Sequence, residues 1–243
     1  MIRESEKVIS ESEARGLTLR LIGGIGIWHT CYSARIPPFK RDYNDIDVIG
    51  RKSESKAISE FFTDLGYRAN QRFNALYGDR RLIFTNSGKT VDLFFDDFVM
   101  SHKFNFSARL SLCKPALSIS DLLITKLQIV NINEKDIIDL FAIFLDHEFG
   151  NEPCINIQVK YINRYTSSDW GIYRTFEDNL TKALNFLPKL SIKENLNDIL
   201  KEKILAFMGY IEKSPKTAKW KIRNMIGTRK KWYYEVSELQ DHA

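Results

Sequence analysis

The chain has 243 residues, of which 44% are apolar, so it can fill the core of one large domain or two modest ones, which argues against disorder. Its net charge is a modest +5, its N-terminus is charged with no apolar run before a cleavage site, and no stretch of about 18 apolar residues occurs. These features argue against a signal peptide or a membrane span and predict a cytoplasmic protein.

The first 50 residues predict a strand, a short helix and a second strand. Residues 3–15 fit a polar helix, and residues 17–22 fit a buried strand that ends at Gly23 and Gly24. A short helix over 25–34 ends before Pro37 and Pro38, because proline cannot continue a helix and the residue before it avoids the helical region. A polar loop then leads to a strand over 45–49.

The next segment ends in the clearest hairpin pattern of the chain. A helix over 54–65 ends at Gly66, and a further strand is expected from Tyr67 onward. Strands over 81–85 and 90–95 flank the sequence Asn-Ser-Gly-Lys, whose Asn and Gly relieve a tight turn. The second hairpin strand carries Asp92.

After about residue 105 the periodicity becomes helical. Ser118 or Ser120 can cap a helix over 121–130, and Asn133 can cap one that runs to residue 147. Residues 150–165 fit a loop or weak strand, and three more helices are expected over 167–186, 191–212 and 215–226. The predicted fold class is α/β (α+β), with a small mixed-sheet module over 1–105 and a helical C-terminal region over 106–243.

Three aspartates form a candidate metal site. Side chains alternate along a strand, so Asp45 and Asp47 point to one side while Ile46 and Val48 point into the core. Asp92 joins them if the hairpin strand lies beside the 45–49 strand. Carboxylates suit Mg²⁺, and phosphoryl and nucleotidyl transfer require metal ions to neutralise and align the reacting oxygens.

The glycine turn before the short helix over 25–34 fits an anion site. The free N–H groups and the dipole at a helix N-terminus favour a triphosphate, and Gly23 and Gly24 allow a close approach to the backbone. A dinucleotide-binding fold is an alternative, but His29 occupies its third glycine position and two prolines interrupt the crossover. A P-loop is excluded because no G-K-[ST] follows.

This joint pattern resembles the polymerase-beta superfamily of nucleotidyltransferases, which combine a Gly-Gly or Gly-Ser turn, an acid-x-acid strand and a later single acid. Within that superfamily the chain is most similar to the AbiE-type toxins, which have an Arg four residues before the first acid, a D-L-L-x-x-K element and a basic-Asp-x-x-Asp-Leu element. The matching segments are Arg41, residues 121–126 and residues 135–140. The resemblance covers about residues 17–145 and implies the following assignments. The implied catalytic residues are Asp45, Asp47, Asp92, Lys126 and Asp136. The implied nucleotide-binding residues are Gly23, Gly24, Arg41, Lys126 and Asp139. The implied ligands of two Mg²⁺ ions are Asp45, Asp47 and Asp92.

Several of these residues also have simpler explanations. At 100° per residue Lys126 falls within the apolar face of its helix, where it must either extend to solvent or meet an anion. Asp136 and Asp139 lie three apart and neighbour each other, but Asp136 also suits the first turn of a helix. Arg41 and the two strand aspartates also fit a solvated loop and strand end.

The spacing of the cysteines and histidines along the sequence matches no metal-ligand pattern. Cys31, Cys113 and Cys154 are odd in number and far apart, so we expect buried thiols rather than a disulfide framework or a zinc site. His29, His102 and His147 are likewise assigned no metal.

The predicted function is Mg²⁺-dependent transfer of a nucleoside monophosphate from an NTP to a hydroxyl acceptor. Residues 213–231, which begin at Lys213 and end at Lys231, are basic without any acid, so an RNA end such as a tRNA is the favoured acceptor, although the segment also fits a solvated face. The toxin resemblance implies a cognate antitoxin. The alternatives are a small-molecule nucleotidyltransferase of the aminoglycoside or lincosamide kind and an inactive nucleotide-binding module.

Overall fold

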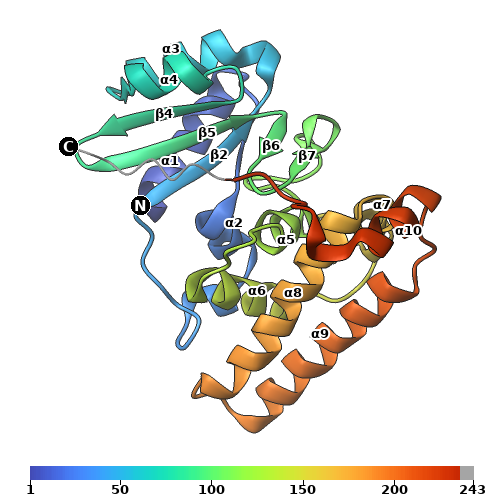
Figure 1. Ribbon diagram of the computed structural model, residues 1–243. Helices are drawn as coiled ribbons and strands as arrows, with labels where there is room; N and C mark the ends of the chain where they lie inside the picture. Colours follow the sequence, from blue (N-terminus) through green and yellow to red (C-terminus); the bar gives the residue numbers. More distant parts are fainter. Residues whose placement is uncertain (236–243) are drawn as a thin grey trace.

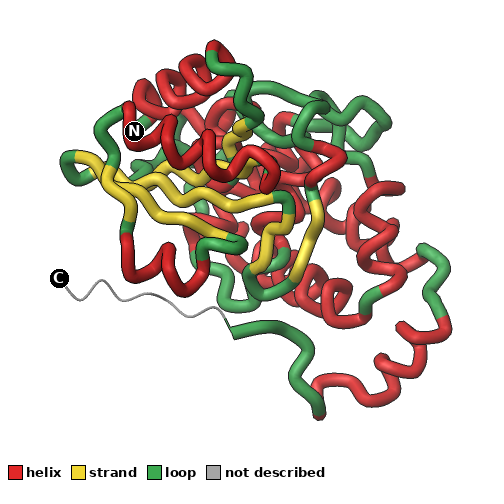
Figure 2. The backbone as a smooth tube through the Cα atoms, turned by 90° about the horizontal axis from the view of Figure 1, so that it is seen from above, coloured by secondary structure: helices red, strands yellow, loops and turns green. Residues whose placement is uncertain are grey.

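A computed structural model describes residues 1–235 of the chain. The strands gather in one half of the molecule and most of the later helices in the other (Figures 1 and 2). In chain order the elements are α1 (Ile2–Ala14), β1 (Leu19–Leu21), α2 (Gly23–Thr30), β2 (Asp45–Gly50), α3 (Ser55–Asp64), β3 (Arg68–Ala69), α4 (Gln71–Tyr77), β4 (Arg81–Asn86), β5 (Lys89–Phe95), β6 (Asp97–Val99), β7 (Lys103–Asn105), α5 (Ile119–Leu127), α6 (Glu134–Asp146), α7 (Val159–Ser168), α8 (Trp170–Phe186), α9 (Glu194–Lys213) and α10 (Ala218–Ile226).

The sheet is mixed. Its main path has the order β1-β2-β5-β4-β3, and β6 and β7 continue from β5. The pair β2–β5 is parallel, whereas the other pairs along the path are antiparallel. The helices α5–α10 follow the last strand in the described chain. The expected fold class, a small mixed sheet followed by a helical region, is therefore confirmed.

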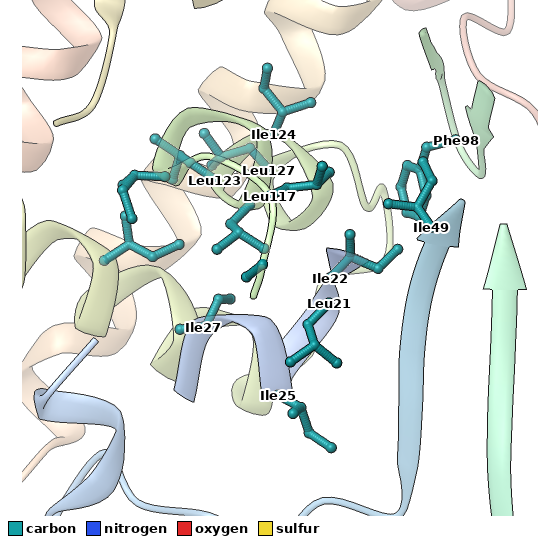
Figure 3. Packing of buried hydrophobic residues seen from close by; sticks show 14 of the residues in the cluster. Leu21, Ile22, Ile25, Ile27, Ile49, Phe98, Leu117, Leu123, Ile124 and Leu127 are labelled. Carbon is teal, nitrogen blue, oxygen red and sulfur yellow. The ribbon is translucent and has the colours of Figure 1, made fainter. Parts of the chain in front are cut away.

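The core joins β1 and α2 to the helical region. Figure 3 shows Leu21, Ile25 and Ile27 on one side and Leu123 and Leu127 of α5 on the other, all buried. The helices α2 and α5 approach closely, because a Cβ on Gly26 would lie only 3.0 Å from a methyl group of Leu122. The opposite face of the sheet is covered by α3, whose Phe62 stacks on Phe84 of β4 with ring centroids 4.9 Å apart. The sheet and the helical region thus share one continuous apolar core.

Local sequence chemistry explains most element boundaries. Ser118 caps α5 and Asn133 caps α6, each by accepting from the backbone N–H three residues later, as expected. The cap of α8 is Asp169 rather than the expected Ser167 or Ser168. Within residues 1–235, no helix has the length and apolar character that crossing a membrane requires.

Five elements differ from the sequence-based expectation. The strand expected from Tyr67 is only two residues long, and the short helix α4 follows it. The three-residue strands β6 and β7 lie in a segment with no predicted strand. The segment expected to be loop or weak strand over 150–165 contains the start of α7. These elements are short or begin inside polar sequence, so periodicity over a longer window does not detect them.

The expectation of three buried thiols is wrong for two cysteines. Cys113 and Cys154 form a disulfide with Cα atoms 5.6 Å apart, although 41 residues separate them. Cys31 is a buried free thiol, as expected. The pairing arises because the loop before α5 returns beside the loop before α7, which is also held by the backbone hydrogen bond from Ile119 to Pro153. Spacing along the sequence carries no information about that approach.

Candidate active site

Two strand aspartates present their carboxylates on one face of β2. Ile46 and Val48 are fully buried, whereas Asp45 is exposed and Asp47 is partly buried on the other face. Because β2 and β5 are parallel with Asp47 in register with Asp92, these two aspartates point to the same side of the sheet. The condition under which Asp92 joins the two β2 aspartates, that its strand lies beside β2, is therefore met.

Asp92 is not free, because Arg81 holds it. The guanidinium donates to both carboxylate oxygens, from Nε to Oδ1 at 2.6 Å and from Nη2 to Oδ2. Sequence reasoning missed this contact. The predicted hairpin contained a signal for it, since Arg81 lies diagonally across the hairpin from Asp92 on the same face.

The two glycines lie directly against the site. Gly23 has a φ of +60° and is the first residue of α2, and a Cβ there would overlap the carboxylate of Asp47. A Cβ on Gly24 would overlap the guanidinium of Arg41. The Gly-Gly turn thus allows an anionic and a cationic side chain to pack on the N-terminus of one helix.

A buried ionic network forms the opposite wall. Arg41 donates to Asp139 from Nε at 3.0 Å and from Nη2 at 2.6 Å. Lys126 lies 2.7 Å from a carboxylate oxygen of Asp136 and 2.9 Å from one of Asp139. Lys126 therefore meets two anions instead of extending to solvent.

These groups border a pocket of about 260 Å³. Six of the sequence-predicted site residues line it, namely Gly24, Arg41, Asp45, Asp47, Lys126 and Asp136, whereas Gly23, Asp92 and Asp139 do not line it. The other six lining residues were not predicted from the sequence as site residues, and they are Ile25, Asp42, Tyr43, Asn44, Asn133 and Lys135. The pocket draws on segments that precede and follow residue 105.

The two sides of the pocket differ in charge balance. Burial, followed by the charges of Asp45 and Asp92, raises the pKa of Asp47 well above its ordinary value. Burial also raises the pKa of Asp139, but Lys126 and Arg41 outweigh it and leave that pKa below its ordinary value. Asp47 is therefore an uncompensated carboxylate, whereas the cations of the opposite wall are neutralised by their partners.

The uncompensated side fits a divalent cation. Asp45 and Asp47 form no ion pair with any described residue, and their oxygens are the ligand type that Mg²⁺ prefers. Among residues 1–235, no three acidic, His or Cys side chains are grouped so that they could hold a metal ion, and Asp92 is paired with Arg81. Mg²⁺ usually takes one or two carboxylates together with phosphate and water, and this pair provides them.

The basic segment 213–231 lies away from the pocket. None of its residues lines the pocket. Figure 1 shows α10 beyond α5 and α8, on the side away from α2. The expected nucleic-acid surface and the candidate site are therefore separate surfaces of the described chain.

Comparisons with known proteins give little that bears on this site. No protein-family profile matches the chain, and no curated protein matches its sequence. Among solved structures it is similar to the antibiotic-resistance factor ANT(2'')-Ia, with 14% sequence identity and a TM-score of 0.43 over 68% of this chain and 92% of that one. A TM-score this low does not establish a shared fold, and none of the comparisons supports the resemblance to AbiE-type toxins.

Proposed function

We propose that the chain is an Mg²⁺-dependent nucleotidyltransferase that moves a nucleoside monophosphate from an NTP to a hydroxyl acceptor. The observation that carries the proposal is the pair Asp45 and Asp47, two carboxylates without a cationic partner in the described chain, at the wall of a pocket that also contains a helix N-terminus. A cation and a polyphosphate together satisfy both features.

In this proposal each group has a defined task. Asp45 and Asp47 bind the Mg²⁺ ions, and Asp92 is the third ligand and accepts the proton of the attacking hydroxyl. Bound Mg²⁺ neutralises phosphate charge and aligns the attacking and leaving oxygens. The N-terminus of α2 at Gly23 and Gly24 receives the triphosphate.

The wall opposite the carboxylates completes the proposed nucleotide site. Lys126 contacts the nucleotide, while Asp136 and Asp139 hold its amine and the guanidinium of Arg41 toward the pocket. The division into a catalytic module over 1–105 and a helical region over 106–243 is part of this proposal, and the end of that region after residue 235 lies outside the described residues.

The favoured acceptor is an RNA end, such as a tRNA, bound through residues 213–231, and a cognate antitoxin is the corresponding protein partner. The positive charge of that segment supports this assignment, because phosphate contacts account for most non-specific nucleic-acid affinity. A small hydroxylated molecule of the aminoglycoside or lincosamide kind is the second candidate. The size of the pocket and its separation from the basic segment favour that candidate.

The test is a transfer assay with each labelled NTP, Mg²⁺ and two sets of acceptors, bulk RNA and hydroxylated antibiotics. Wild type should label one set, Asp47→Asn should abolish labelling, and the exposed control Asp79→Asn should leave it unchanged. RNA binding that weakens steeply with salt supports the RNA acceptor. If Mg²⁺ and NTP raise the melting temperature without any transfer, the chain is a nucleotide-binding module, the third alternative. If the wild type shows no transfer and Mg²⁺ with NTP does not raise its melting temperature, both the enzyme reading and the nucleotide-binding reading are refuted.

A further inference from the structure

Asp92 is the one proposed metal ligand whose carboxylate is already paired with a cationic side chain of the described chain. Arg81 takes both of its carboxylate oxygens, which is the strongest arrangement that a side-chain ion pair adopts. The side chains are 25% and 11% exposed, so water screens the pair little. Asp45 and Asp47 have no such partner in the described chain.

The surroundings of Arg81 hold it over Asp92. Its guanidinium lies 5.5 Å from the ring centroid of Phe73 in α4 and 5.0 Å from that of Phe94 in β5. Phe94 is also its direct cross-strand partner in the hairpin. Contacts with two aromatic rings and a two-point ion pair fix a long side chain that would otherwise move freely.

A guanidinium and a divalent cation compete for one carboxylate, because each needs its negative charge and its oxygen lone pairs. We propose that Arg81 is a positioning residue that occupies Asp92 in the metal-free protein and releases it to the metal ion at the attacking hydroxyl. This inference rests on the proposed function. Arg81 thereby weakens metal binding at Asp92 while leaving the Asp45 and Asp47 carboxylates open to a first ion.

The test measures metal affinity directly, by titrating the full chain with Mn²⁺ alone and following free Mn²⁺ by electron paramagnetic resonance. Arg81→Met should tighten Mn²⁺ binding by about tenfold, the scale of coupling between groups in contact. The control is Arg80→Met. It removes the neighbouring exposed arginine, which pairs with Asp79 at the surface, and it should leave the affinity within about twofold of wild type.

Two further variants separate positioning from simple charge. Arg81→Lys keeps the charge and preserves folding if Arg81→Met does not, yet it cannot bind both oxygens in a fork, so it should also tighten Mn²⁺ binding. In an Asp92→Asn background, Arg81→Met should change the affinity by less than about twofold, because the residue through which Arg81 acts is gone.

Two results overturn the proposal while sparing the proposed function. One is Mn²⁺ binding that depends on Asp47 but does not tighten in either Arg81 variant. The other is a tightening that persists in the Asp92→Asn background, which makes Arg81 a nearby charge only. If the Mn²⁺ binding of the wild type is absent or is the same in Asp47→Asn, the assigned metal site is wrong. The proposed function and the role of Arg81 are then both refuted.

Discussion

Replacing Asp139 by Asn tests whether the buried ionic network holds the pocket wall together. The Asp139 side chain is 1% exposed and accepts from three donors, two on Arg41 and one on Lys126. Asparagine keeps the shape but removes the charge, so the two cations are left with Asp136, which among the described residues forms an ion pair with Lys126 alone. Breaking a buried pair costs about 3 to 5 kcal/mol, which lowers the melting temperature of a chain of this size by roughly 10 °C.

The matched control is Asp64→Asn. Asp64 pairs with Arg15 at 2.6 Å, the same distance as the shortest Arg41–Asp139 contact, but these side chains are 58% and 43% exposed. Solvent screens an exposed pair, so this variant should lose less than about 1 kcal/mol. Urea unfolding followed by circular dichroism gives both free energies. Equal losses in the two variants would show that burial does not set the strength of the network and would refute the reasoning.

Three other predictions concern separate features. Gly23→Ala should lose stability and Mn²⁺ affinity because its Cβ displaces Asp47, whereas Gly88→Ala, at a φ of +79° with open space around it, should lose stability only, by about 1 to 2 kcal/mol. Calorimetry measures the stability of both variants and Mn²⁺ titration measures their affinity. Equal Mn²⁺ affinities in the two variants would show that a Cβ at residue 23 does not displace Asp47. Burial lowers the pKa of His102 to about 4 from 6.5, so the unfolded chain binds the extra proton, and the free energy of unfolding should fall by up to about 3 kcal/mol as pH drops from 6.5 to 4. His102→Gln should flatten that part of the stability profile, and an unchanged profile would show that His102 does not cause it. Reducing the disulfide, which closes a 41-residue separation, should cost about 4 kcal/mol in the chain-entropy description. Dithiothreitol should lower the melting temperature of the wild type but not that of a double cysteine-to-serine variant. An unchanged melting temperature in the wild type would show that the disulfide does not stabilise the fold.

Sequence reasoning succeeded where a short local pattern fixes the structure. Alternation along a strand placed Asp45 and Asp47 on one face, and the turn residues set the hairpin whose second strand carries Asp92. The caps Ser118 and Asn133 likewise follow from a hydrogen bond between residues three apart in the sequence. Each of these features is decided by residues close together in the chain.

The sequence by itself therefore determined the type of chemistry that the proposal assigns, through two neighbouring carboxylates behind a glycine turn. Tertiary structure alone decided which groups are free to act. It paired Arg41 with Asp139 across 98 residues and bonded Cys113 to Cys154. The physical reason is that an ion pair or a disulfide depends on the distance between side chains in space. That distance is fixed by how helices and strands pack, which local periodicity does not encode.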